Sequence, residues 1–175
     1  PMTHWGGLKA TDDLAKMCRI SKSKYVFETG CHTGRNACYL VKKYGCRVEG
    51  IDISKLLIDK ARERARKSKL EDKVAFRVAD AQDLPYDDET FDAVIVQFVT
   101  VFLNKKKALS EYVRVTKKGG YVGDNEGYWI SNESVRQEKF EKLFQEVTGF
   151  KAKLLTSEQW KKLFEESGLE NIQVK

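Results

Sequence analysis

The sequence predicts an α/β fold in which a doubly wound, mostly parallel sheet is covered by helices on both faces. Short apolar runs alternate with amphipathic helical stretches between residues 25 and 124, which is the pattern of a parallel sheet. The run at 91–97 is apolar along its length, as expected for a strand whose two faces are both covered. Right-handed crossovers between successive strands then place helices on both sides of the sheet.

The elements of the first half follow from apolar spacing and from capping residues. Leu14, Met17 and Cys18 recur at helical spacing. Gly45 is the expected end of a second helix, and Ser54 is the expected N-cap of a third. The elements predicted here are a helix at 8–19, a strand at 25–28, a helix at 35–44, a strand at 47–51, a helix after Ser54 and a strand at 74–78.

In the second half, the strand at 91–97 is followed by a helix at 105–116 that Gly119-Gly120 would end, and by a strand at 121–124. Thr156 and Gln159 form a capping-box pair that opens a further helix, which ends at Gly168. Also predicted are a helix at 131–147 and a last short strand at 169–174. The helix at 131–147 carries an apolar stripe, which is interpreted as core packing or as the inner face of a lid. The stripe consists of Phe140, Leu143, Phe144 and Val147.

Composition excludes several functional classes. The 175 residues carry 32 Lys and Arg against 26 Asp and Glu, but the excess lies along helical stretches without an interleaved aromatic–basic patch, so a nucleic-acid partner is not expected. The longest apolar stretch, 93–103, is far shorter than the ~20 residues of a membrane span. Residues 1–5 lack the features of a signal peptide, and Pro1 before Met2 suggests a trimmed start. A cytoplasmic protein is expected.

The four cysteines and two histidines do not form a metal-ligand pattern. No two cysteines stand at Cys-x-x-Cys spacing, so we expect no metal site and interpret the cysteines as free, buried thiols. The four residues are Cys18, Cys31, Cys38 and Cys46.

The chemistry is expected just past the strand ends, where parallel sheets bind ligands. Gly30 and Gly34 allow close backbone approach, but their spacing is not that of a phosphate loop. Glu28 would repel a phosphate and suits an ammonium group, while Asp52 is placed to accept two ribose hydroxyls. Asp80, followed by Ala81, offers an acceptor and a backbone donor to the edge of an adenine. An adenosine that carries an amino acid fits all three positions, which indicates S-adenosylmethionine.

Five ordered blocks also resemble the class I S-adenosylmethionine-dependent methyltransferases. Residues 26–35, Val-Phe-Glu-Thr-Gly-Cys-His-Thr-Gly-Arg, are similar to the family's first motif. The pattern is closest to the small-molecule subgroup that includes the ubiquinone and menaquinone C-methyltransferases. The other four blocks are 50–54, 78–81 with Leu84-Pro85, 91–94 and 111–120.

The resemblance implies a cofactor site and a reaction. Methyl transfer would proceed by in-line substitution to a small, apolar or aromatic acceptor and leave S-adenosylhomocysteine. Glu126, Tyr128 and Trp129 are the candidate acceptor-binding residues, and no catalytic residue is assigned. The alternatives are a cofactor-binding module with weak or no transferase activity and, less favoured, a nicotinamide-dependent oxidoreductase. The implied cofactor-binding residues are Glu28, Gly30, Cys31, Gly34, Asp52, Ile53, Asp80, Ala81 and Gln97.

The chain departs from the family pattern at three places, the first of which is Glu28, where the family more commonly has aspartate. His32 stands where the family has a second glycine, and Val101-Phe102 replaces a pair that contains histidine, which removes an obvious base. Residues 97–100 lack the tetrad of methyltransferases that act on nucleic-acid amines.

Residues 1–175 are expected to form one domain, and the division below follows from the resemblance. The family's sheet has seven strands, and this chain ends inside its sixth. The last antiparallel strand is therefore expected to be missing, with a second copy as one cover for the open sheet edge. The expected parts are a cofactor-binding core at 8–125, a lid insertion at 126–156, and the last helix and strand at 157–175.

Overall fold

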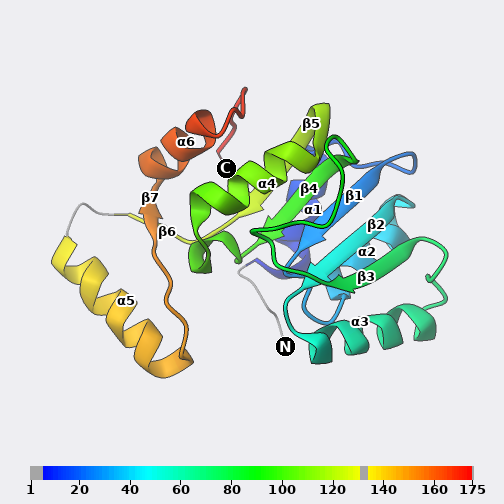
Figure 1. Cartoon of the computed structure of the whole chain (residues 1–175), viewed down its shortest axis with the longest axis horizontal. Helices are drawn as coiled ribbons and strands as arrows, with labels where there is room; N and C mark the ends of the chain where they lie inside the picture. The colour runs from blue at the N-terminus through cyan, green and yellow to red at the C-terminus, as the bar shows by residue number, and fades with distance from the viewer. Residues whose placement is uncertain (1–5, 131–133, 175) are drawn as a thin grey trace.

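A five-stranded, fully parallel sheet in the order β3-β2-β1-β4-β5 forms the centre of the molecule (Figure 1). The computed structural model describes residues 6–130 and 134–174, so the expectation for residues 1–5 lies outside the described part of the chain. The predicted fold class is confirmed. The strands are β1 Tyr25–Thr29, β2 Arg47–Asp52, β3 Val74–Val78, β4 Phe91–Gln97 and β5 Thr116–Asn125.

Helices cover both faces of this sheet. One face packs against α1, α2 and α3, and the other packs against α4 and α6 (Figure 1). Adjacent residues of one strand serve opposite layers, since Val26 belongs to the first core and Phe27 to the second. The helices are α1 Gly7–Met17, α2 Arg35–Tyr44, α3 Lys55–Lys67, α4 Lys105–Val115, α5 Ser134–Thr148 and α6 Ser157–Glu166, with a short 3₁₀ helix, η1, at Thr100–Phe102.

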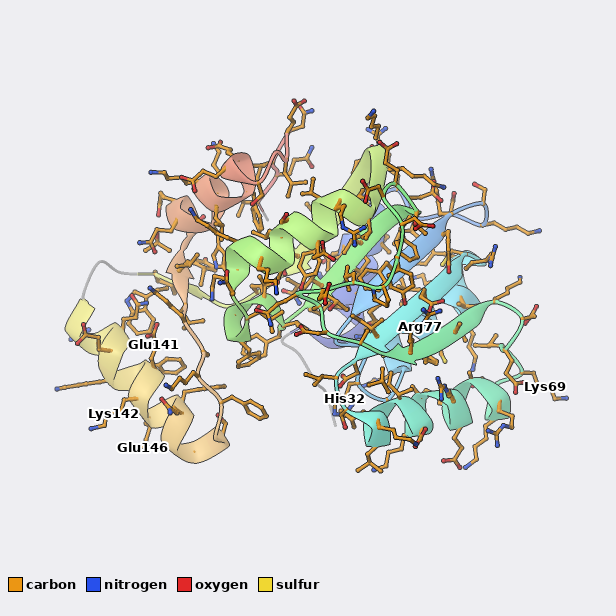
Figure 2. All side chains as sticks on the ribbon, in the orientation of Figure 1. His32, Lys69, Arg77, Glu141, Lys142 and Glu146 are labelled. Atoms are coloured by element: carbon orange, nitrogen blue, oxygen red, sulfur yellow. The ribbon has the colours of Figure 1, made fainter. Side chains whose placement is uncertain are left out.

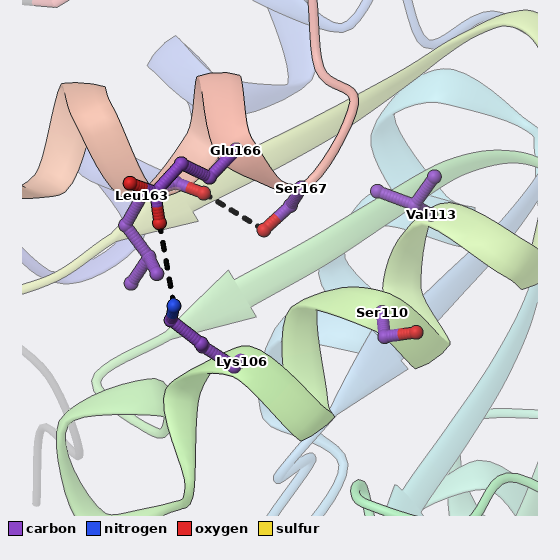
Figure 3. Close-up of a pocket in the computed structure, with 6 residues that line it drawn as sticks. All are labelled: Lys106, Ser110, Val113, Leu163, Glu166 and Ser167. Carbon is purple, nitrogen blue, oxygen red and sulfur yellow. Dashed lines mark hydrogen bonds and ion pairs between the residues drawn. The ribbon is translucent and has the colours of Figure 1, made fainter.

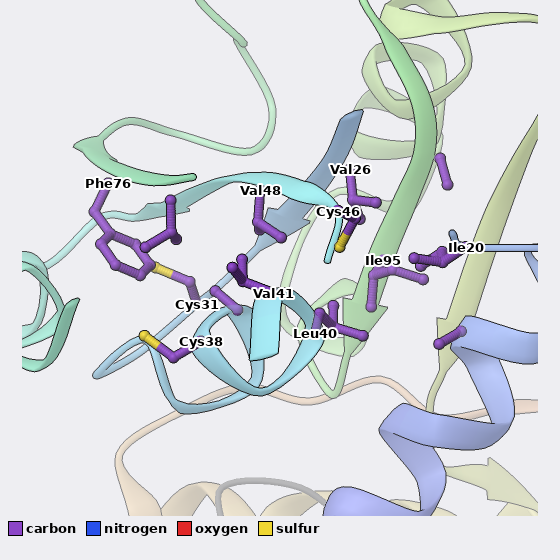
Figure 4. Packing of buried hydrophobic residues seen from close by; sticks show 14 of the residues in the cluster. Ile20, Val26, Cys31, Cys38, Leu40, Val41, Cys46, Val48, Phe76 and Ile95 are labelled. Carbon is purple, nitrogen blue, oxygen red and sulfur yellow. The ribbon is translucent and has the colours of Figure 1, made fainter. Parts of the chain in front are cut away.

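The first core holds all four cysteines, three of which are labelled in Figure 4. Cys31, Cys38 and Cys46 lie among aliphatic side chains and Phe76, and Cys18 belongs to the same cluster. All four thiols are free and buried, as the sequence predicts. Burial raises the pKa of Cys46 to about 11 because a thiolate would lose its hydration there.

The predicted helix caps are confirmed. Ser54 Oγ accepts a hydrogen bond from the Leu57 N–H at 3.4 Å, and Gly45 ends α2 in the left-handed conformation. Thr156 and Gln159 form the complete capping box of α6, with bonds of 3.2 Å and 2.9 Å in its two directions.

Two predicted boundaries are wrong. Helix α4 ends at Val115, and Gly119-Gly120 lie inside β5, where the register shifts between Phe91 and Ala93 of the neighbouring strand. Gly119 has φ +73°, and a Cβ at Gly120 would lie 2.8 Å from the Asp92 carbonyl oxygen, so both glycines accommodate the bulge.

The predicted strand at 169–174 is also wrong, since residues 169–174 form no strand. The Leu169 N–H folds back onto the Phe164 carbonyl at 3.1 Å, beside Gly168 at φ +87°. Asn171, at φ 55°, turns the backbone again. The alternation of apolar and polar residues at 169–174 predicts a strand. The left-handed conformations of Gly168 and Asn171 instead bend the backbone, so no extended strand forms.

Helix α5 stands apart from the helices that cover the sheet, on the side toward which the strands point (Figure 1). Leu143 and Val147 are 58% and 76% exposed, so the core-packing interpretation of the apolar stripe is wrong. Phe140 and Phe144 instead contact Trp129 and Phe102, with ring centroids 5.9 Å and 6.1 Å apart. A two-stranded parallel pair that the sequence did not predict, β6 Tyr128–Trp129 with β7 Leu155–Thr156, joins this region to α6.

No helix among the described residues has both the length and the apolarity needed to cross a membrane.

Candidate functional site

The strand ends predicted to carry the chemistry meet at one edge of the sheet. Thr29 at the end of β1 pairs with Ile51 of β2 and with Val96 of β4, and Gln97 pairs with Asn125 of β5. The strand order reverses between β1 and β4, and in doubly wound sheets ligands bind beside that reversal.

The turn between β1 and α2 requires glycine at two positions. Gly30 has φ +61°, and a Cβ there would lie 2.4 Å from Val99 Cγ2. Gly34 has φ +69°, and a Cβ there would lie 2.5 Å from Phe76 Cζ. The side chain of Val99, after β4, and that of Phe76, in β3, occupy the places that a Cβ would need. Only glycine therefore fits at these two positions of the turn.

His32 is the third residue of the same turn with a positive φ angle. It adopts φ 50°, and its backbone N–H donates to Asp52 Oδ2 at 3.0 Å. The other oxygen, Asp52 Oδ1, accepts the Ser54 N–H at 2.9 Å. The ring lies at the strand-end edge (Figure 2), and its buried Nδ1 has no hydrogen-bond partner within the described residues. The histidine thus takes the left-handed conformation for which a glycine would serve.

Beneath the turn, Glu28 and Gln97 belong to a buried polar network. The Asn36 side-chain amide donates to Gln97 Oε1 at 3.2 Å, and the Thr11 hydroxyl donates to the same oxygen at 3.1 Å. Burial raises the pKa of Glu28 to about 8, although a hydrogen bond from Asn36 favours the ionised form. Glu28 Oε2 is buried without a partner in the described chain.

Sequence reasoning missed Asn36 and Thr11. Each stands on the inner face of its helix beside apolar residues, and a polar residue on an otherwise apolar face was the available signal.

On the β2–β3 side of the edge, an exposed apolar side chain follows the end of β2. Ile53 is 76% exposed although it directly follows Asp52. Asp80 is exposed, and its Oδ1 accepts the Gln82 N–H at 2.9 Å, while Ala81 is buried. Acceptor oxygens and an uncovered aliphatic surface thus lie at the same end of the sheet.

Past β5, the structure places Glu126 differently from the expectation of a rim residue. Its Oε1 accepts the backbone N–H groups of Val99 and Thr100, at 2.8 Å and 2.5 Å. The Thr100 hydroxyl donates to Asp124 Oδ2 at 3.2 Å. The carboxyl group of Glu126 thus holds the segment that enters η1.

Burial raises the pKa of Asp124 and raises that of Glu126 to about 7. The negative charge of Glu126 raises the pKa of Asp124 further. One oxygen of each, Asp124 Oδ1 and Glu126 Oε2, is buried without a partner within the described residues. Of the other two candidate acceptor residues, Tyr128 is 54% exposed and Trp129 is partly buried.

Two cavities lie near this region, and neither is lined by a predicted cofactor residue. The smaller, about 240 Å³, lies between α4 and α6, where Lys106 and Glu166 form an ion pair at 3.4 Å (Figure 3). The larger, about 730 Å³, lies between η1, the start of α4, α5 and residues 151–155. Within the described ranges, no group of three or more His, Cys, Asp or Glu side chains could hold a metal ion.

Residues 27–123 match the methyltransferase domain family. The match covers more than half of the chain and runs from β1 into β5. The chain belongs to the class I S-adenosylmethionine-dependent methyltransferases.

Similar proteins support the assignment of this methyltransferase domain. An uncharacterised protein of Haemophilus influenzae is 34% identical over 170 residues, which cover 95% of this chain and 66% of that protein. The methyltransferase GfsG of Streptomyces halstedii is 33% identical over 115 residues, which cover 65% of this chain and 41% of that protein. The crystal structure of the MccD protein has a TM-score of 0.86 at 30% identity and covers 95% of this chain and 72% of that one. The chain thus spans less than two thirds of the length of these two curated relatives.

Replacing Glu126 with glutamine should flatten the dependence of stability on pH. The folded-state pKa of Glu126, about 7, lies above the ordinary value of 4.5, so the folded protein holds this proton more tightly than the unfolded chain. Stability from this group is fully present below pH 4.5 and is lost as the pH rises to about 7. Urea unfolding should show that Glu126→Gln removes about 3 kcal/mol of that loss.

The exposed Glu146, on α5 (Figure 2), provides the matched control. Glu146→Gln should leave the pH dependence of unfolding unchanged. Parallel pH curves for the wild type and Glu126→Gln would contradict the burial of this carboxyl group.

Proposed function

We propose that this domain binds S-adenosylmethionine at the carboxyl edge of the sheet and transfers its methyl group to a small, apolar or aromatic acceptor, with S-adenosylhomocysteine as the product. One observation carries the proposal: Glu28, Asp52 and Asp80 lie at or just past the ends of three adjacent strands, beside the glycine-containing turn that follows β1. The three carboxylates suit an ammonium group, a ribose and an adenine amino group, respectively.

The residues present fit this cofactor. The orphaned Glu28 Oε2 is a buried acceptor that an ammonium group would satisfy. Each oxygen of Asp52 accepts one backbone N–H and keeps a second lone pair for a ribose hydroxyl. Ile53 presents an uncovered apolar face, which an adenine ring would cover. Gly30, Cys31 and Gly34 would contribute backbone, and Ala81 and Gln97 would complete the site.

The chain's own part in catalysis is positioning. The cofactor, when bound, supplies the electrophilic methyl group. Asn36 and Thr11 hold Gln97 at the end of β4 through bonds of 3.2 Å and 3.1 Å. Glu126 fixes the backbone at Val99 and Thr100, so the segment beside the turn keeps one conformation. Fixed walls around the reacting atoms favour in-line alignment of nucleophile, methyl carbon and sulfur.

The aromatic cluster beside α5 supports an acceptor with an apolar or aromatic body. Phe102, Phe140, Phe144 and Trp129 are joined by ring contacts, and the partly exposed α5 carries two of them. We propose that residues 126–156 act as the lid over the acceptor, with Tyr128 and Trp129 on its inner side. The motif pattern favours the subgroup that includes ubiquinone and menaquinone C-methyltransferases.

A cofactor-binding module without transferase activity is the second candidate. His32 within the glycine turn and Val101-Phe102 in place of a histidine-containing pair favour it. Release of S-adenosylhomocysteine in the presence of candidate acceptors distinguishes a transferase from a module that only binds.

Asp52→Ala should weaken S-adenosylhomocysteine binding by about tenfold to a hundredfold, the value of hydrogen bonds from two hydroxyls to a charged group. Isothermal titration of the whole chain measures this, and thermal unfolding checks that the variant is folded. Asp59→Ala, at an exposed position in α3, is the control and should bind as the wild type does. Unchanged affinity in Asp52→Ala would show that the ribose lies elsewhere.

Cofactor binding should also release a proton below about pH 8. Burial raises the pKa of unliganded Glu28 to about 8, and a bound ammonium group would lower it by favouring the carboxylate. Affinity should therefore rise as the pH increases from 6 to 8 and then level off. Titrations in buffers of different ionisation enthalpy count the protons released.

Glu28→Gln is the control, because the ligand's own amine titrates equally with both proteins. The variant should release fewer protons and show a flatter affinity profile. Equal proton release by the two proteins would remove Glu28 from the ammonium site.

A further inference from the structure

The larger cavity, of about 730 Å³, carries an excess of positive charge. It is an open groove between η1 and the start of α4 on one side and α5 and residues 151–155 on the other. Five lysines and two glutamates line it, and none of these residues belongs to the predicted cofactor site. The charged lining residues are Lys105, Lys106, Lys142, Lys151, Lys153, Glu138 and Glu141.

Contacts within the protein neutralise only part of this charge. Lys106 forms an ion pair with Glu166 at 3.4 Å (Figure 3). Glu141 Oε1 is already used as an acceptor, since it takes the Gln137 side-chain N–H at 2.8 Å and the Leu154 N–H at 3.1 Å. It thereby ties α5 to the strand segment that closes the cavity. The other glutamate of the lining, Glu138, is exposed.

Besides Lys105, three of the lysines have no ion pair within the described residues. Lys151 and Lys153 lie on the closing segment, and Lys142 lies on α5 beside Glu141 (Figure 2). Their side chains carry charges that a ligand could neutralise without breaking an internal contact.

Lys105 is the most enclosed of the five. Its Nζ donates to the Val101 carbonyl at 3.1 Å and lies 5.8 Å from the centroid of the Trp160 ring. Burial lowers the pKa of Lys105, and the positive charge of Lys153 lowers it further, while Glu126 and Glu141 act in the opposite direction. Lys105 is thus partly dehydrated and the exposed Lys153 lies close enough to repel it, so an anion placed between them would be attracted by both.

The same cavity has an apolar wall that leads back to the cofactor edge. Val101 and Phe102 of η1 line it. The Phe102 ring contacts Phe150 and also Phe98, with centroids 5.9 Å and 5.3 Å apart. Phe98 directly follows Gln97, at the end of β4. The ring contacts of Phe102 therefore connect this wall to the residue that directly follows β4.

We propose that this cavity binds the anionic end of the methyl acceptor, a small molecule that combines an apolar or aromatic body with a carboxylate or phosphate group. The proposal rests on the proposed function, because it assigns the acceptor of that reaction. The aromatic body would lie against Phe102 toward the end of β4, and the anion would lie between Lys105 and Lys153.

Isothermal titration of the whole chain with three matched probes tests this proposal: 1-naphthoate, 1-naphthyl phosphate and the neutral 1-naphthamide. S-adenosylhomocysteine is titrated separately, and each probe is tested with and without it. At least one anion should bind about tenfold more tightly than the amide, with an affinity that falls as salt is added. The tighter of the two anions identifies the acidic group.

Substitutions by methionine, which keeps side-chain length, locate the binding. Lys105→Met and Lys153→Met should each weaken binding of the preferred anion by about fivefold and leave the amide and S-adenosylhomocysteine unaffected. Lys139→Met is the control, because this exposed lysine lies on α5 but does not line the cavity. Lys153→Met decides the test if Lys105→Met does not fold.

The proposal would be overturned if the amide and the anions bound with equal affinity. It would also be overturned if Lys139→Met and Lys153→Met lost equal affinity for the preferred anion. Neither outcome would affect cofactor binding. A chain that binds the anions but not S-adenosylhomocysteine would instead contradict the proposed function. The two failures are therefore distinguishable.

Discussion

The close passage of the backbone through the turn after β1 is the constraint on which the rest of the site depends. At Gly30 and Gly34 a Cβ would lie within 2.4 Å and 2.5 Å of neighbouring side chains, so the chain has one route from β1 into α2. That route sets the first turn of α2 and with it the position of Asn36 under the strand ends. It also brings the His32 N–H to Asp52. The end of β1, the end of β2 and the start of α2 therefore form one rigid unit.

Burial of two acidic side chains around this unit is unfavourable for the free energy of the folded protein. Glu28 and Glu126 have raised pKa values because burial removes water from their carboxylates, and each keeps an oxygen without a partner in the described chain. A buried acceptor left unsatisfied is unfavourable for the folded protein alone. Such strained electrostatics are common where a ligand completes the structure. The first carboxylate is the proposed partner of the cofactor's ammonium group, whereas the second holds the segment that enters η1.

The sequence predicts most of the fold, and it predicts that the polar residues after the strands meet at one edge, because the determinants are local. Strand runs, the Ser54 cap, the Thr156 capping box and the motif order all depend on neighbours in the chain. Contacts that depend on tertiary packing could not be predicted this way. The inward turn of Glu126, the network through Asn36 and the lysine cavity each join segments far apart in sequence, and the pairing of β6 with β7 extends over only two residues per strand.

The central claim is that the cofactor lies along the carboxyl edge, from the turn after β1 to the end of β3. A crystal structure of the whole chain with S-adenosylhomocysteine tests it most directly. The ribose hydroxyls should lie within hydrogen-bond distance of Asp52, the adenine should cover Ile53, and the amino group should lie toward Glu28. A ligand bound elsewhere, with Asp52 and Ile53 as uncovered as they are in the unliganded chain, would contradict it.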